Sequence, residues 1–108
     1  MVELGIESMQ MAGYVVNLEA KALANNYLRE VLFTAPRSQL VVMSIAPGED
    51  IGMEVHSDVD QFIRIEAGMG KAVLNGQEHE LAEGSAVVIP AGTEHNIINL
   101  SPKEPLKL

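Results

Sequence analysis

The chain has 108 residues, of which 47% are hydrophobic and 4% aromatic, so it can bury one small core made mainly of aliphatic side chains. Seven lysines and arginines against 15 aspartates and glutamates give a net charge of −8, and such a surface repels nucleic-acid phosphates and anionic membranes, so we expect neither as a partner. The absence of cysteine excludes disulfides, thiolate metal ligands and a cysteine nucleophile.

Residues 1–13 show no clear period, and we expect them to form a poorly ordered lead. This start has neither the basic segment nor the apolar segment of a secretory signal. No apolar run in the chain reaches membrane-spanning length. These features predict a soluble, cytoplasmic protein.

The segment 18–32 is rich in good helix formers. The pair Asn25-Asn26 interrupts it, and two adjacent asparagines favour a turn. From Tyr27 to Thr34 the residues become β-branched and aromatic. We therefore interpret 27–34 as a strand rather than as the continuation of one long helix.

After residue 34 the pattern is consistently that of strands separated by Gly, Pro and Asn turns, with the strongest hairpin signal at Asn75-Gly76. We expect strands over 38–45, 51–56, 60–67, 71–74, 78–81, 86–89 and 95–100. In the strand 60–67, alternation places Gln61, Ile63 and Ile65 on one face and Phe62, Arg64 and Glu66 on the other. So many short strands predict an all-β sandwich or barrel with negligible helix.

Four polar residues on these strands have the chemistry of metal ligands. Glu54 and His56 stand two residues apart, so on a strand both side chains point to the same face. His95 follows a Pro-x-Gly turn on another strand, and Gln61 lies on a third. Imidazole nitrogen, carboxylate oxygen and amide oxygen are all donors to hard or borderline cations. We predict that Glu54, His56, Gln61 and His95 converge on one metal ion.

The spacing of these residues resembles the two motifs of the cupin superfamily. The first motif is a glycine, five residues, His-x-His, four residues, a glutamate, six residues and a glycine; its positions here hold Gly48, Glu54, His56, Gln61 and Gly68. The second is Gly-x5-Pro-x-Gly-x2-His-x3-Asn, matched without departure by Gly84, Pro90, Gly92, His95 and Asn99. Glu54 therefore replaces the first histidine and Gln61 the glutamate.

The resemblance implies a single cupin domain over 1–108, with both motifs inside 48–99. Its fold would be the cupin double-stranded β-helix, a jelly-roll-like barrel of two antiparallel sheets, and it also favours the strand at 27–34. The ligand set would bind one divalent ion among Mn, Fe, Ni, Zn and Cu. Because the set keeps one negative charge, as His-His-Glu-His would, we interpret the site as rearranged rather than lost. Gln61 would either ligate the ion or orient a water or substrate.

Two classes of function remain open. Cupins with such sites include dioxygenases, decarboxylases and sugar isomerases, so one hypothesis is a metal-dependent enzyme that acts on a small polar organic molecule. The alternative is a non-catalytic module that binds or senses a small ligand, with a degenerate or empty metal site. The pattern identifies neither the reaction nor any catalytic residue.

The remaining expectations concern assembly and single residues. Phe62, Met53 and Val55 form an outward apolar row that a second subunit would cover, which predicts a homodimer. His79 is expected to be exposed, and Asn99 to bind backbone rather than to react. Leu106 to Leu108 reads as the start of a further strand; if Leu108 is the natural end, we expect a pocket mouth that is more open or is closed by a segment of another subunit.

Overall fold

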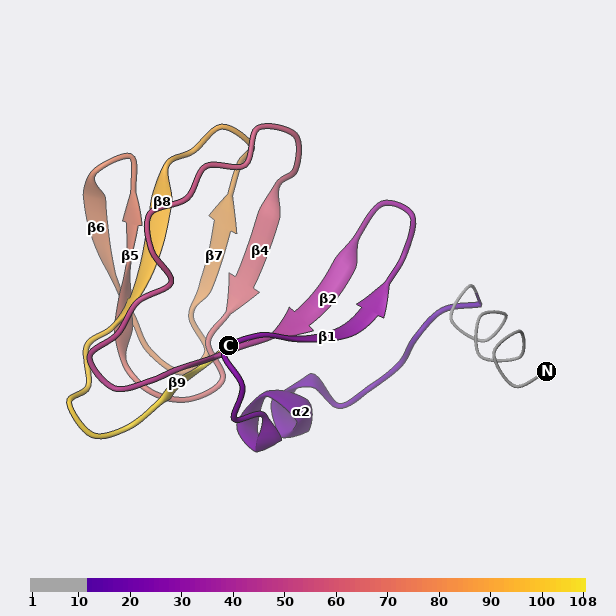
Figure 1. The fold of residues 1–108 in the computed structure, drawn as a ribbon, viewed down its shortest axis with the longest axis horizontal. Coiled ribbons are helices and arrows are strands. Elements are labelled where there is room, and N and C mark those ends of the chain that lie inside the picture. The colour runs from indigo at the N-terminus through magenta and orange to yellow at the C-terminus, as the bar shows by residue number, and fades with distance from the viewer. Residues whose placement is uncertain (1–11) are drawn as a thin grey trace.

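The computed structural model describes residues 12–108, so the expected lead over 1–13 falls almost wholly on residues 1–11, outside that range. The described residues form one helix and nine strands (Figure 1): α2 (Leu18–Ala24), β1 (Glu30–Thr34), β2 (Gln39–Val42), β3 (Ser44–Ile45), β4 (Gln61–Arg64), β5 (Gly70–Leu74), β6 (Gln77–Leu81), β7 (Ala86–Ile89), β8 (His95–Asn99) and β9 (Leu106–Lys107). The all-β class is confirmed. No helix in residues 12–108 has the length and apolar character needed to cross a membrane.

The helix α2, of seven residues, is the only one in the described part of the chain, which agrees with the expectation of little helix. Asn17 caps its N-terminus, because the side-chain oxygen accepts a hydrogen bond from the Ala20 N–H at 3.0 Å. The helix ends where the asparagine pair begins, since the Asn25 side chain bonds both the N–H and the carbonyl of Tyr27 and turns the chain. The following strand starts at Glu30, three residues later than predicted.

The strands pair antiparallel in four sheets: β1 with β2, β3 with β9, β4 with β7, and β6–β5–β8. Two continuous sheets, as the cupin resemblance implies, are therefore not formed by these hydrogen bonds. The strand expected over 51–56 is reduced to single bridges at Asp50 and Glu54. The cause is local: Gly52 has a φ of +86°, and the Asp50 carboxylate accepts its N–H at 2.7 Å, which bends the chain.

The body formed by β3 to β9, called the barrel below, encloses one aliphatic core. Its buried residues are Ile45, Ile65, Ala72, Leu81, Val87, Ile89, Ile97 and Leu106. The predicted alternation along β4 is confirmed, with Ile63 and Ile65 facing this core and Phe62 and Arg64 exposed. It fails at Glu66, which is buried because its carboxylate accepts a hydrogen bond from the Arg64 guanidinium at 2.9 Å.

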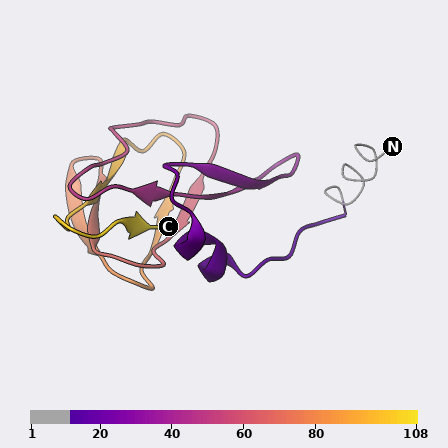
Figure 2. The same cartoon turned by 60° about the horizontal axis from the view of Figure 1, so that its bottom comes forward.

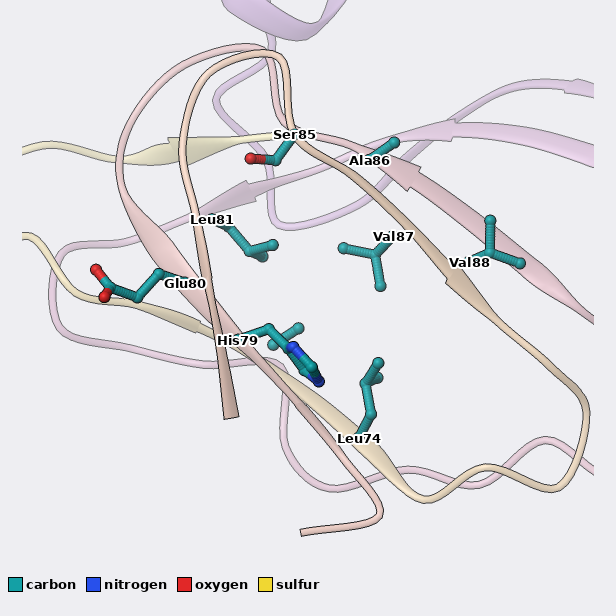
Figure 3. A pocket seen from close by; sticks show the side chains of 9 residues that line it. Leu74, His79, Glu80, Leu81, Ser85, Ala86, Val87 and Val88 are labelled. Atoms are coloured by element: carbon teal, nitrogen blue, oxygen red, sulfur yellow. The ribbon is translucent and has the colours of Figure 1, made fainter. Parts of the chain in front are cut away.

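The hairpin β1–β2 extends beyond the barrel, as the two views in Figures 1 and 2 show. One aromatic contact covers part of this hairpin: the ring of Phe33 stacks on that of Tyr14, with ring centroids 5.3 Å apart. On the barrel itself, β6 is an outer strand of its sheet, and His79 is exposed there as predicted. His79 also lines a pocket between β5, β6 and β7 (Figure 3).

A buried lysine ties the last strand to the end of the helix. The Lys107 side chain on β9 is 6% exposed, and its ammonium donates hydrogen bonds to the carbonyl of Asn25 and to the Asn26 side-chain oxygen. A buried charge is tolerated when its protons are bonded in this way. Lys107 therefore fixes the Asn25-Asn26 turn, and with it α2, against the barrel.

Replacing Lys107 by methionine is expected to lower the free energy of unfolding by about 1–3 kcal/mol, because the bonded oxygens lose their donor. The amides of Asn25 and Tyr27 should then exchange faster with solvent, which hydrogen–deuterium exchange measures. Lys103→Met is the matched control, since Lys103 is exposed. Equal exchange rates in both variants would contradict the tether.

Candidate metal centre

Backbone hydrogen bonds join the segments that carry the two motifs. Glu54 and His95 form an antiparallel bridge in which each N–H donates to the other's carbonyl, at 2.8 and 2.9 Å. Two residues on, the His56 carbonyl accepts the Gly92 N–H at 2.7 Å. Gly92 has a φ of +86°, a conformation that glycine adopts without strain. The Pro-x-Gly turn of the second motif is therefore fastened to the loop of the first.

Asp60 adds a second fastening at this turn. Its carboxylate accepts the Ala91 N–H at 2.8 Å, although the two residues are 31 apart in sequence. Asp58 and Asp60 are both exposed, as expected of turn residues. The sequence pattern could not predict this hydrogen bond of Asp60, because the partner is a backbone N–H, which every residue except proline has.

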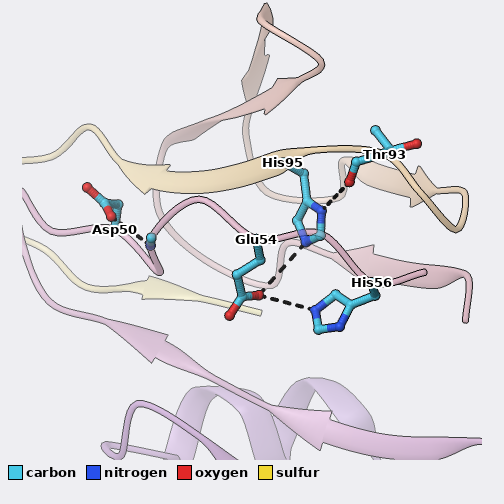
Figure 4. Close-up of polar contacts among 6 residues, drawn as sticks. Asp50, Glu54, His56, Thr93 and His95 are labelled. Carbon is cyan, nitrogen blue, oxygen red and sulfur yellow. Dashed lines mark hydrogen bonds and ion pairs between the residues drawn. The ribbon is translucent and has the colours of Figure 1, made fainter. Parts of the chain in front are cut away.

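His95 is the most constrained of the predicted ligands. Its side chain is 1% exposed at the start of β8. The Nδ1 atom lies 2.9 Å from the Thr93 carbonyl oxygen, and since a carbonyl only accepts, Nδ1 donates its proton there. Nε2, the other ring nitrogen, lies 3.9 Å from a Glu54 carboxylate oxygen (Figure 4). A second bond that fixes the tautomer is typical of a metal-binding histidine.

Glu54, His56 and His95 form a compact triangle of donors. The Glu54 carboxylate oxygen lies 3.4 Å from His56 Nε2 and 3.9 Å from His95 Nε2, and all three ligand atoms are within 4.8 Å of one another. The two imidazole rings are 5.6 Å apart between centroids. Ligands at about 2.0–2.2 Å from one ion in a tetrahedral site are separated by roughly 3.3–3.6 Å. A shift of little more than about 1 Å would therefore bring all three to one ion.

The triangle is open to solvent on one side. The Glu54 and His56 side chains are 45% and 41% exposed, in contrast to His95. Both residues follow the bend at Gly52 and lie at the rim rather than on the regular strand expected over 51–56. Two imidazoles and one carboxylate with an open side leave coordination positions for water or a small molecule.

Gln61, the fourth predicted ligand, has a buried oxygen without a partner. It pairs with the buried Ile89 across β4 and β7, so its side chain faces the barrel interior. Among residues 12–108, only its Oε1 and that of Asn96 (Oδ1) are buried side-chain acceptors lacking a hydrogen bond. Such an orphan costs free energy unless a cation or donor satisfies it. The donor set therefore fits a divalent ion, and ligation by Gln61 stays a prediction.

Comparison with known proteins supports the motif reading. A family model described as Cupin domain matches residues 41–108. The crystal structure of BH2720 from Bacillus halodurans is similar, with a TM-score of 0.84 and 39% identity, over 87% of this chain and 75% of that one.

Two sequence relatives match nearly the whole chain. Protein L612 of Acanthamoeba polyphaga mimivirus is 49% identical over 104 residues, which covers 94% of this chain, and protein YrkC of Bacillus subtilis (strain 168) is 45% identical over 102 residues, which covers 88%. This chain spans 65% of the first relative and 54% of the second.

Proposed function

The chain belongs to the cupin domain family, and from this premise we propose that its barrel binds one divalent metal ion and uses it to act on, or to bind, a small polar organic molecule. The observation that carries the proposal is the donor triangle of Glu54, His56 and His95, with ligand atoms within 4.8 Å. We include Gln61 in the set because its buried oxygen lacks a donor. We also propose that the domain has the architecture of the cupin double-stranded β-helix, with two antiparallel sheets.

Each residue has a distinct part in this site. His95, held by the Thr93 carbonyl, presents one nitrogen at a fixed position. Glu54 supplies the negative charge that offsets part of the ion's charge, and His56 completes the group at the exposed rim. A bound divalent ion would act as a Lewis acid on oxygen atoms of a small molecule that enters from the open side.

The second candidate function is a binding or sensing module without turnover. It is favoured by the two departures from the cupin motif, since a glutamine oxygen is a weaker ligand than the carboxylate it replaces. Weaker ligation would suit reversible occupancy by a ligand. Both functions use the same residues, so only an experiment with added small molecules separates them.

Metal-loaded protein should be incubated with a panel of small organic acids and sugars, and followed for both product formation and thermal shift. Conversion of a compound supports the enzyme, and stabilisation without conversion supports the binding module. The rim variant His56→Ala should lose either effect, whereas Glu83→Ala should retain it, since Glu83 is exposed and lies outside the donor triangle. Equal responses of both variants would contradict the site.

We further propose that the chain forms a homodimer through the outer face of β4–β7. Phe62 and Val88 are cross-strand partners there, with 67% and 63% of their surfaces exposed. Met53 and Val55 are likewise more than half exposed. A second copy would cover these side chains, and its projecting β1–β2 hairpin, with Arg29 just before β1 and Arg37 in the turn, would meet the acidic barrel favourably.

Light scattering is expected to give twice the chain mass of 11.7 kDa. Phe62→Glu should shift the protein towards the monomer, because it places an unpaired charge in the covered face. Leu100→Glu is the control, since Leu100 is also exposed but lies at the end of β8. A monomeric wild-type protein, or equal dissociation by both variants, would refute the interface.

A further inference from the structure

The barrel has a second opening, away from the donor triangle, between two strands that do not pair. In the described part of the chain, β6 ends one sheet and β7 ends another, so no strand joins them. Residues from both strands and from β5 nevertheless line one cavity of about 350 Å³. This size lies at the lower end of the ~300–1,000 Å³ typical of small-molecule sites.

The strand register explains why this cavity exists. His79, Ala72 and Ile97 stand side by side across β6, β5 and β8, so their side chains share the inward face. Ala72 and Ile97 are fully buried, whereas His79 is exposed. The small Ala72 leaves space in the middle of this row, and no strand covers His79 from the side of β7. His79 therefore faces inward and yet remains exposed to solvent.

The walls and the polar groups of the cavity define what it can bind. Leu74, Leu81 and Val87 point towards the hollow together with the His79 imidazole (Figure 3). The Ser85 hydroxyl accepts the Ala82 N–H at 3.0 Å and keeps its proton free to donate. Glu80 lies at the rim and points away from the hollow, where its charge disfavours anions.

We propose that this lateral pocket is a binding site for a neutral small molecule with an apolar body and one hydroxyl or N–H group, with His79 as the hydrogen-bonding partner. The aliphatic walls take the apolar body, and the imidazole accepts or donates the single polar bond. Leu74 pairs in register with His95, so the ligand lies one side chain away from the donor triangle. The inference does not depend on a bound metal.

The test uses the full chain, freed of metal by chelator and labelled with ¹³C at leucine and valine methyl groups. The probe is 4-methylphenol, and 4-methylbenzoate is its anionic counterpart. Millimolar 4-methylphenol is expected to shift the methyl signals of Leu74, Leu81 and Val87 in a saturable way, while the benzoate binds at least tenfold more weakly, a difference of about 1.4 kcal/mol.

His79→Trp should abolish the shifts, because the indole fills the hollow. Glu78→Trp is the matched control, since Glu78 neighbours His79 on β6 but faces the opposite side, and it should bind as the unaltered protein does. If His79→Trp does not fold, His79→Ala tests the hydrogen bond instead, with an expected loss of about 2–10-fold in affinity. Shifts that do not saturate, that centre on other methyl groups, or that survive in both His79 variants would overturn the proposal.

Discussion

Replacing His95 by alanine is expected to weaken divalent-metal binding by about 100-fold or more. Changes to groups that merely orient a ligand already cost ~10–100-fold in metal affinity, and His95 would be a direct ligand whose Nε2 lies 3.9 Å from the Glu54 carboxylate. The loss also frees the Thr93 carbonyl, which now accepts the imidazole proton at 2.9 Å. Titration of metal-free protein, followed by calorimetry, measures the change.

His79→Ala is the control for this variant. It removes the remaining histidine outside the donor triangle, so metal affinity should stay within twofold of the unaltered protein. Thermal unfolding of the metal-free variants separates a lost ligand from a lost fold, because His95 is buried and its removal also leaves a small cavity. Equal metal affinity in His95→Ala and the unaltered protein would remove His95 from the site.

Replacing Asn99 by leucine is expected to lower the free energy of unfolding by about 3–5 kcal/mol. The Asn99 side chain is 2% exposed, and the two protons of its amide nitrogen are shared among the carbonyls of Ile45, Ala46 and Glu104, at 2.8–3.2 Å. Its oxygen accepts the Ser101 N–H at 2.8 Å. Leucine has a similar volume but leaves these backbone groups unpaired in the interior.

For a domain of this size the change corresponds to a melting temperature lower by about 12 °C or more. Asn96→Leu is the matched control on the same strand, because the Asn96 oxygen is already buried without a partner. Replacing it should leave the melting temperature unchanged or raise it. A similar loss in both variants would mean that the hydrogen bonds of Asn99 contribute little.

The sequence was informative wherever a periodic pattern or a motif fixed a residue's surroundings. Alternation along β4 predicted that Ile65 is buried and Phe62 exposed, and both are. The second motif placed Asn99 in a structural role, and its four backbone contacts agree. Turn chemistry ended the helix at the asparagine pair. These features depend on neighbours in sequence or on the fixed spacing of residues within a motif.

Other features could not be predicted because neither an alternation nor a motif indicates the contact that produces them, whether the partner is two residues away or 82. Glu66 is buried against the alternation, since Arg64 neutralises it within the fold. The bend at Gly52 reduces the strand expected over 51–56 to single bridges and places Glu54 at the rim. Lys107 is buried because its ammonium bonds the turn after α2, 82 residues away. Each depends on a partner that no local pattern names.

The two openings of the barrel suggest how metal and ligand could be tested separately. Leu74 of the lateral pocket lies on β5 and is the register partner of His95 of the donor triangle on β8, so the two places meet at neighbouring strands. A ligand that fills the pocket would press on Leu74 without touching a donor atom. Its effect on metal affinity would therefore report coupling between the two places rather than ligation.

Elemental analysis of protein produced without chelator is the most direct test of the central claim, that Glu54, His56 and His95 bind a divalent ion in this barrel. We predict about one equivalent of a single transition metal per chain, retained on gel filtration and lost in His95→Ala. Less than a tenth of an equivalent, with no rise in melting temperature on adding Mn, Fe, Ni, Zn or Cu, would contradict the metal centre.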